Sequence, residues 1–334
     1  MQKSHPHKSG HAEHDHHHGV IDPKVVTTER GKQAVKWSFW ALMTTALLQL
    51  VVVSISGSVA LLADTLHNFG DAFTALPLWI AFNLARRKPT DRFTYGLGRI
   101  EDLAGIIIIL VILASALAAG YESIIRFFEP RPVKMLWTVV FAALIGFAGN
   151  ELVARYRIKV GKEIKSAALE ADGQHARVDG LTSLSVLLSA LGVWLGYPLT
   201  DPVVGLLITL AILKIVWDAG KSVFMRLLDG VDPEVIDQIK QVVSRVDGVR
   251  DVSEIRVRWI GHRLHAEVNL AVASELSLMD AHNISTDVRH ETLHELPYLS
   301  HVLIHVDPLD ESGEDFHSIE NHTHKDHPQQ HSHP

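Results

Sequence analysis

The chain contains no cysteine among its 334 residues. This absence excludes a disulfide framework, a thiolate zinc finger, a cysteine nucleophile and an iron–sulfur cluster. It leaves only nitrogen and oxygen ligands for a bound metal, and these suit borderline to hard divalent ions. The sequence also lacks an excess of basic charge, since its formal net charge is −7. It therefore gives no reason to expect a nucleic acid partner.

Charged residues are missing from four long stretches, which indicate membrane-spanning helices. A helix of about 20 apolar residues crosses the hydrocarbon core of a bilayer. The charge-free runs have 27, 19, 16 and 21 residues and cover Trp37–Ala63, Leu103–Tyr121, Met135–Asn150 and Gly180–Thr200. Two further spans, over about 61–86 and 202–220, include a few ionisable residues. We expect an all-α domain of six transmembrane helices over residues 31–228.

The basic residues predict how these helices are oriented. Two connections are rich in Lys and Arg, those after the second and fourth spans: Arg86, Arg87, Lys88, Arg92, Arg99, and Arg155, Arg157, Lys159, Lys162, Lys165. The connections after the first and fifth spans contain neither residue, and the third connection is a mild exception. By the positive-inside rule, we expect a multi-pass protein of the inner (cytoplasmic) membrane with both termini in the cytoplasm.

Histidine is abundant, with 22 residues, and 13 of them lie near the two ends of the chain. Seven fall in residues 1–30 and six in residues 309–334, among polar residues that cannot form a core. Both segments are predicted to be disordered tails. They would raise the local metal concentration, store metal, or have no transport role, and a purification tag is a further interpretation of the first run.

Residues 229–308 are typical of a small soluble α+β domain. Apolar spacing predicts helices over Pro233 to about Val246 and Leu278 to about Leu296. Alternating residues predict strands over Val252–Val257, Leu264–Val272 and Ser300–Val306. The order α-β-β-α-β indicates helices on one face of a three-stranded sheet.

Two predicted spans contain the same pattern of ionisable residues, A-D-x-x-H-x-x-x-D. The second span has His67 and Asp71, and the fifth has His175 and Asp179. A spacing of four places each pair on one helix face, so two such helices together offer a tetrahedral set of two nitrogens and two oxygens, which suits Zn²⁺. The alternative is hydrogen-bonded packing, although ionisable residues inside membranes are usually functional.

The leading aspartates of the pattern, Asp64 and Asp172, suggest a further hypothesis. Because the two spans run in opposite directions, Asp64 is expected on the outer side of its pair and Asp172 on the inner side. They would then serve as way-stations on the two access routes. Solvation of the helix ends is the alternative.

The six-span layout and the paired motifs resemble the cation diffusion facilitator family over residues of about 30–308. Gly98-Arg99-x-Glu101 and Arg226-Leu-Leu-Asp229 add to the resemblance. It implies a homodimeric exporter, not an enzyme, that exchanges cytoplasmic Zn²⁺ or a related ion for protons. It also implies a transport site at His67, Asp71, His175 and Asp179, and a charge interlock between Arg99 and Asp229.

The same resemblance implies a regulatory metal site in the cytoplasmic domain. The matching residues are His282, His305 and Asp307. Ser253 and Asn269 stand at two other ligand positions, so a weaker or mononuclear site is expected, completed by His265. Ordinary surface histidines are the alternative.

One motif points to a different chemistry, because His290-Glu291-x-x-His294 fits the metalloprotease signature H-E-x-x-H. A helical projection places Leu278, Ala281, Ile284 and Val288 on one apolar stripe and the two histidines nearly opposite. A protease needs this pair buried in a cleft with a third ligand. We therefore expect solvent-exposed histidines without catalytic function.

Competition between metal and protons for one ligand set predicts antiport, since coordinating groups must be deprotonated. Imidazole titrates near physiological pH, so His67 and His175 would exchange protons under a modest gradient. Three alternatives remain open: a membrane-anchored metal sensor, a passive metal channel, and a transporter specific for Co²⁺, Cd²⁺ or Fe²⁺.

Overall fold

The computed structural model describes residues 23–56, 65, 69, 75–128, 136–197 and 199–313. The predicted histidine-rich tails therefore lie largely outside the described residues. Within these tails, residues 23–30 are helical and Leu309–Glu311 form a 3-10 turn, so the prediction of disorder is wrong there. Asp64, His67 and Asp71 also lie outside them, so half of the predicted transport site has no described geometry.

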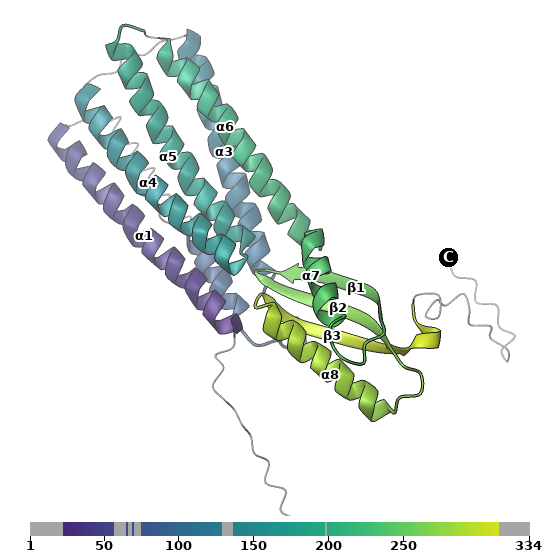
Figure 1. The fold of residues 1–334 in the computed structure, drawn as a ribbon. Helices are drawn as coiled ribbons and strands as arrows, with labels where there is room; N and C mark the ends of the chain where they lie inside the picture. The colour runs from purple at the N-terminus through teal and green to yellow at the C-terminus, as the bar shows by residue number, and fades with distance from the viewer. Residues whose placement is uncertain are drawn as a thin grey trace, which may run out of the picture.

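Long helices packed side by side form the first part of the chain (Figure 1). They are α1 (Pro23–Ser56), α3 (Ile100–Phe128), α4 (Leu136–Ile164), α5 (Ala167–Trp194) and α6 (Thr200–Leu227). A shorter apolar helix over Ala75–Ala85 belongs to the second predicted span. The helix α5 packs against α3, α4 and α6, and α1 packs against α4. These contacts give α5 a central place in the bundle.

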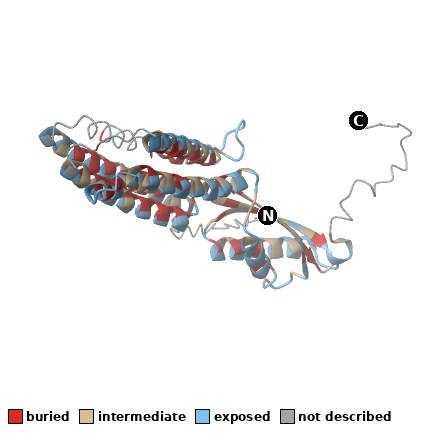
Figure 2. Ribbon diagram, turned by 90° about the horizontal axis from the view of Figure 1, so that it is seen from above, coloured by how far each residue is buried: buried red, intermediate tan, exposed pale blue. Residues whose placement is uncertain are grey.

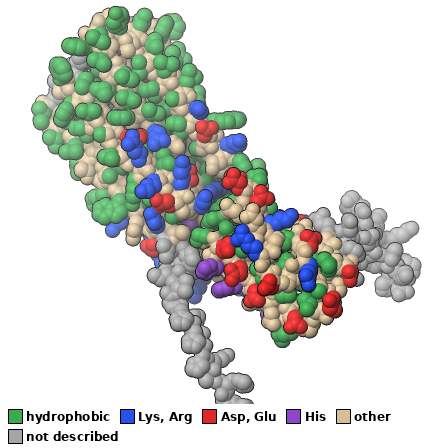
Figure 3. All heavy atoms as spheres, in the orientation of Figure 1, with side chains coloured by type: hydrophobic (Ala, Val, Ile, Leu, Met, Phe, Trp, Pro, Cys, Tyr) green, Lys and Arg blue, Asp and Glu red, His purple; other side chains and the backbone are tan. Residues whose placement is uncertain are grey.

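Among the described residues, four helices are long and apolar enough to cross a membrane: α1, α3, α4 and α6. The helix α5 has a similar length but includes five ionisable residues in its first half, Glu170, Asp172, His175, Arg177 and Asp179. Large apolar side chains cover the outside of the bundle, and Leu152, Trp137 and Trp217 are 71–75% exposed. Hydrophobic side chains dominate the end away from the second domain, as Figure 3 shows. Such a surface fits lipid contact.

The helices α4 and α5 are joined by a tight turn and approach each other closely. Lys165 in this turn has a φ of 58°, in the left-handed region that L-residues rarely adopt. Near the turn, a Cβ atom added to Gly173 would lie 2.9 Å from the backbone nitrogen of Ile158. Only glycine permits this approach, and small residues at helix contacts are typical of membrane bundles. The close packing fixes the position of α5 against α4.

The second part is an α+β domain with the predicted element order. It comprises α7 (Pro233–Val243), β1 (Asp251–Ile260), β2 (Arg263–Val272), α8 (Leu278–Glu295), β3 (Leu299–Pro308) and a short 3-10 turn, η1 (Leu309–Glu311). The sheet order is β1-β2-β3, with β1 antiparallel and β3 parallel to β2. The prediction for this domain is confirmed, although the strands extend further than expected.

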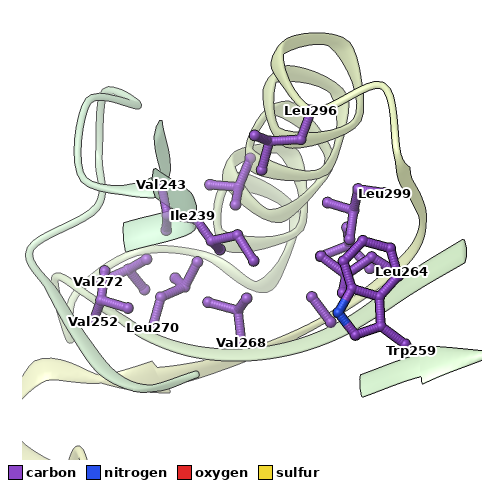
Figure 4. Packing of buried hydrophobic residues seen from close by; sticks show 13 residues of the cluster. Ile239, Val243, Val252, Trp259, Leu264, Val268, Leu270, Val272, Leu296 and Leu299 are labelled. Atoms are coloured by element: carbon purple, nitrogen blue, oxygen red, sulfur yellow. The ribbon is translucent and has the colours of Figure 1, made fainter. Parts of the chain in front are cut away.

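Both helices of this domain pack on one face of the sheet, where the core lies (Figures 2 and 4). Ile239 and Val243 from α7 and Val288 from α8 meet inward-facing strand residues such as Val268 and Leu270. All five are fully buried. Burial of an aliphatic side chain stabilises a fold by about 1.5–3 kcal/mol. The opposite sheet face is left for polar side chains.

Side-chain caps begin both helices of the domain. Asp232 accepts a hydrogen bond from the backbone nitrogen of Glu234 at 3.3 Å, and Pro233 follows as the first helical residue. Ser277 accepts one from the backbone nitrogen of Asp280 at 3.2 Å. Each cap satisfies an amide that the helix itself leaves unpaired. The start predicted at Asp232-Pro233-Glu234 is confirmed.

Candidate metal site

The structure places His175 and Asp179 together in the interior of the bundle. Both are on α5, one turn apart, and their residue exposures are 2% and 6%. The distance from His175 Nε2 to Asp179 Oδ2 is 3.9 Å. The predicted pairing on one helix face is therefore observed for this half of the site. An imidazole and a carboxylate at this separation face a common space and suit a divalent cation of borderline character.

A second buried ionic group lies one turn before His175. Arg157 Nη1 on α4 lies 3.0 Å from Asp172 Oδ2 on α5, and the two side chains are 1% and 0% exposed. The assignment of Arg157 to a connecting loop is wrong, because α4 continues to Ile164. The partner on α5 compensates the arginine charge, which explains why the helix can bury it. The way-station role of Asp172 stays a prediction.

In the α+β domain the structure pairs His305 with Asp307 on β3. His305 Nε2 lies 2.8 Å from Asp307 Oδ1, with side chains 53% and 4% exposed. His305 is also the register partner of Asn269 on β2. Across the described ranges, no three His, Asp or Glu side chains of one chain are grouped to hold a metal. The exposed His282 on α8 therefore does not join this pair, and the three-residue site stays a prediction.

The H-E-x-x-H pair is exposed on α8, as expected. The rings of His290 and His294 are stacked with centroids 6.2 Å apart, and both residues are exposed. Val288 is fully buried on the opposite side of the helix. Leu278 does not belong to the buried stripe that the helical projection predicts, because it lies at the first residue of α8 and is 89% exposed.

The two parts of the molecule meet at the end of α6. Arg99 Nη2 forms an ion pair with Asp229 Oδ1, which is the predicted charge interlock. Arg226 lies over the Trp259 ring at 4.5 Å and donates a hydrogen bond to the carbonyl oxygen of Gly261 at 3.3 Å. The last turn of α6 thus contacts both α3 and the sheet. Figure 3 shows charged side chains gathered on this half of the molecule.

Comparison with known proteins agrees with this architecture. Residues 35–228 match the cation efflux transmembrane domain, and residues 231–309 match the cytoplasmic domain of cation efflux proteins. The probable cation efflux system protein Rv2025c of Mycobacterium tuberculosis is 53% identical over 290 residues, which cover 87% of each chain.

Two more distant relatives cover most of the chain. The manganese efflux system protein MneS of Bacillus subtilis is 27% identical over 85% of this chain and 97% of its own. The magnetosome protein MamB of Magnetospira sp. is 24% identical over 83% and 95%. The apolar bundle and the appended α+β domain thus define a membrane transporter of divalent metal cations. The chain belongs to the cation efflux family, the cation diffusion facilitators.

Proposed function

We propose that this protein exports Zn²⁺ from the cytoplasm in exchange for protons, through a site formed by His67, Asp71, His175 and Asp179. The buried His175–Asp179 pair on the central helix α5 is the observation that carries the proposal. Burying ionisable side chains inside a membrane domain costs stability, and such residues are usually functional, which supports a role in binding. The proposal includes six spans over residues 31–228 and a cytoplasmic location for both termini.

The proposed cycle follows from the chemistry of these side chains. Two carboxylates balance the charge of Zn²⁺, which makes a site of low dielectric tolerable for the ion. When the ion leaves, His175 and Asp179 take up protons, because the charged and unshielded carboxylate is then costly to keep buried. The same atoms must lose these protons before the next ion is coordinated. Rocking of the helices between the two sides completes the exchange.

The preference for Zn²⁺ rests on ligand type. Imidazole suits zinc, copper and nickel, whereas manganese prefers oxygen ligands. MneS is named for manganese efflux, so manganese is the competing substrate to test. Co²⁺, Cd²⁺ and Fe²⁺ remain alternatives because their ligand preferences overlap with those of Zn²⁺.

Uptake into proteoliposomes tests the proposal. We expect Zn²⁺ flux that rises with an opposing proton gradient and is abolished in His175→Ala. The control variant is His301→Ala, which replaces an exposed histidine of the cytoplasmic domain and should transport normally. Mn²⁺, Co²⁺, Cd²⁺ and Fe²⁺ are measured in parallel. Absence of flux for all ions would indicate a membrane-anchored sensor, and flux that ignores the gradient would indicate a channel.

We also propose that the protein is a homodimer whose cytoplasmic domain, residues 229–308, binds regulatory metal. Because one chain leaves His282 apart from His305 and Asp307, the site would be completed only when two copies associate. Zinc titration of the full-length protein should therefore show, beside binding at the transport site and the tails, a further binding component that the exposed-residue variant His282→Ala weakens and dilution to monomers removes. Binding that is unaffected by His282→Ala would remove this residue from the site.

The histidine-rich tails, residues 1–30 and 309–334, are proposed to raise the metal concentration near the transport site, because ligands on a flexible tether act at high effective concentration. Deleting residues 1–22 and 314–334, which contain all 13 tail histidines, leaves α1 intact and should slow transport at limiting Zn²⁺ without changing the rate at saturating Zn²⁺. Equal rates at limiting Zn²⁺ would exclude this role.

A further inference from the structure

The turn between β1 and β2 inserts into the cytoplasmic end of the helical bundle. Gly261 in this turn has a φ of 63°, and a Cβ atom added to it would lie 2.7 Å from the carbonyl oxygen of Gly98. Its backbone nitrogen donates a hydrogen bond to Asp102 Oδ2 at 3.2 Å. The turn thus contacts the start of α3 through its backbone. It carries the next residue, His262, into an environment where it is only 3% exposed.

Both ring nitrogens of His262 face residues of the helical bundle. Nδ1 lies 2.6 Å from Glu101 Oε2 on α3, and Nε2 lies 3.2 Å from Thr28 Oγ1 on α1. A carboxylate accepts, so Nδ1–H is the donor to Glu101. Thr28 Oγ1 also accepts a hydrogen bond from Arg263 Nη2 at 3.2 Å. The imidazole is therefore fixed at both ends.

The second carboxylate oxygen of Glu101 contacts the residue at the beginning of α5. Ser166 Oγ donates a hydrogen bond to Glu101 Oε1 at 2.5 Å, and both residues are buried. Ser166 directly precedes α5, and its Oγ accepts a hydrogen bond from the backbone nitrogen of Leu169 at 3.1 Å. Ser166 is thus the N-cap of α5, a position where a hydroxyl satisfies an otherwise unpaired amide. Glu101 holds this cap in place.

We infer that His262 is a positioning residue for metal transport. Through Glu101 and Ser166 it links the cytoplasmic domain to the first turn of α5, the helix that carries His175 and Asp179. The inference rests on the proposed transport site at those two residues. A movement of the cytoplasmic domain that withdraws His262 removes one donor from the buried Glu101 carboxylate. The N-cap of α5 then loses its fixed partner, and the start of the helix becomes free to shift.

Hydrogen–deuterium exchange of the full-length protein in lipid nanodiscs, without metal, tests the link directly. The amides at 167–172 are compared in wild type, His262→Leu, Ser166→Ala and the double variant. We expect about fivefold faster exchange in His262→Leu, close to that of Ser166→Ala, since losing an N-cap typically costs about 1 kcal/mol. The double variant should be no faster than Ser166→Ala alone, because both changes act through one carboxylate.

Two further variants serve as controls. His262→Gln keeps a side-chain N–H that can donate to Glu101, and it should restore slow exchange. His301→Leu removes an exposed histidine from the same domain and should leave these amides unchanged. In uptake assays, the KM for Zn²⁺ should rise about fivefold in His262→Leu, in step with the loss of the N-cap, and return toward wild type in His262→Gln.

Unchanged exchange at 167–172 in His262→Leu would overturn the inference, and so would additive effects in the double variant or an unchanged KM for Zn²⁺ in His262→Leu. If His262→Leu does not fold, His262→Ala, which also removes the donor to Glu101, is compared with His262→Gln instead, and equal exchange in these two variants would overturn the inference. The exchange measurement needs neither metal nor transport. A wild-type protein that moves no metal would therefore refute the proposed function without refuting the link.

Discussion

The buried ion pair between Arg157 and Asp172 gives a prediction whose size follows from the structure. The charged atoms are 3.0 Å apart and the side chains are 1% and 0% exposed. At an effective dielectric constant of about 20, such charges attract each other by about 5 kcal/mol. Removing one partner leaves the other charge buried and uncompensated, which typically costs about 3–5 kcal/mol. Asp172→Asn and Arg157→Met should each destabilise the protein by this amount.

The double variant, Arg157→Met with Asp172→Asn, should recover most of the loss, because no buried charge then remains. Thermal unfolding in detergent, followed by tryptophan fluorescence, measures the effect. At roughly 3 °C per kcal/mol, each single variant should lower Tm by about 10 °C. Arg155→Met is the matched control on α4. Its side chain is 73% exposed and pairs with Glu151, so a shift below about 3 °C is expected.

Two results would refute this reasoning. Single variants that melt within about 3 °C of wild type would mean that the pair is not buried in the protein. A double variant that loses the sum of both single losses would mean that each residue has another essential partner. Either result would also remove the physical reason for an arginine in the interior of the α4–α5 hairpin.

Three further predictions concern single positions. Gly173→Leu should lower Tm by about 6 °C or more, because overpacking at a close helix contact costs about 1–3 kcal/mol or more. The control Gly220→Ala should melt like wild type, because its added Cβ atom would lie 4.0 Å from the nearest atom. Ser277→Ala should cost about 1 kcal/mol by loss of a helix cap, measurable by exchange of the first amides of α8. His305→Ala should weaken zinc binding by the full-length protein, measured by titration calorimetry with transport at saturating Zn²⁺ as the control.

The α+β domain was predictable because its core follows from local alternation. Val302, Ile304 and Val306 on β3 pack toward the helices, while His305 and Asp307 occupy the intervening positions. A strand places alternate residues on opposite faces, so this division needs no knowledge of the rest of the fold. The ends of the strands were harder to predict, since pairing with neighbours extends a strand beyond its apolar residues.

The helical bundle shows where charge counting fails. The absence of charge predicts that the fourth span ends at Asn150, although α4 reaches Ile164. Arg157 is buried there because Asp172, which is 15 residues further along the chain, packs against it. Such compensation depends on tertiary packing. No pattern within a single span predicts that Arg157 and Asp172 form a pair.

His262 shows the same limit more sharply. In sequence it follows Gly261 between two strands, a position typical of an exposed turn. In the sequence, Glu101 belongs to the motif Gly98-Arg99-x-Glu101, which indicates no partner for it. The partnership arises because the turn enters the bundle, which no local pattern predicts. A turn with a histidine after glycine would look the same if it pointed into solvent.

Among the described residues, the Arg99–Asp229 ion pair and the Glu101–His262 hydrogen bond both connect the α+β domain, or its link to α6, with the bundle, and they differ in burial. Arg99 and Asp229 are 38% and 47% exposed, so water and salt screen their attraction and the pair contributes little to stability. Glu101 and His262 are 1% and 2% exposed and contact each other at 2.6 Å. A buried carboxylate that loses its partner costs several kcal/mol of stability, so the contact is favoured strongly when the two residues meet and its loss is costly. The exposed pair lies at the end of α6, whereas the buried pair continues through Glu101 to Ser166 at the start of α5. Of the two, the buried pair is therefore the one through which the proposed link between the α+β domain and α5 would act.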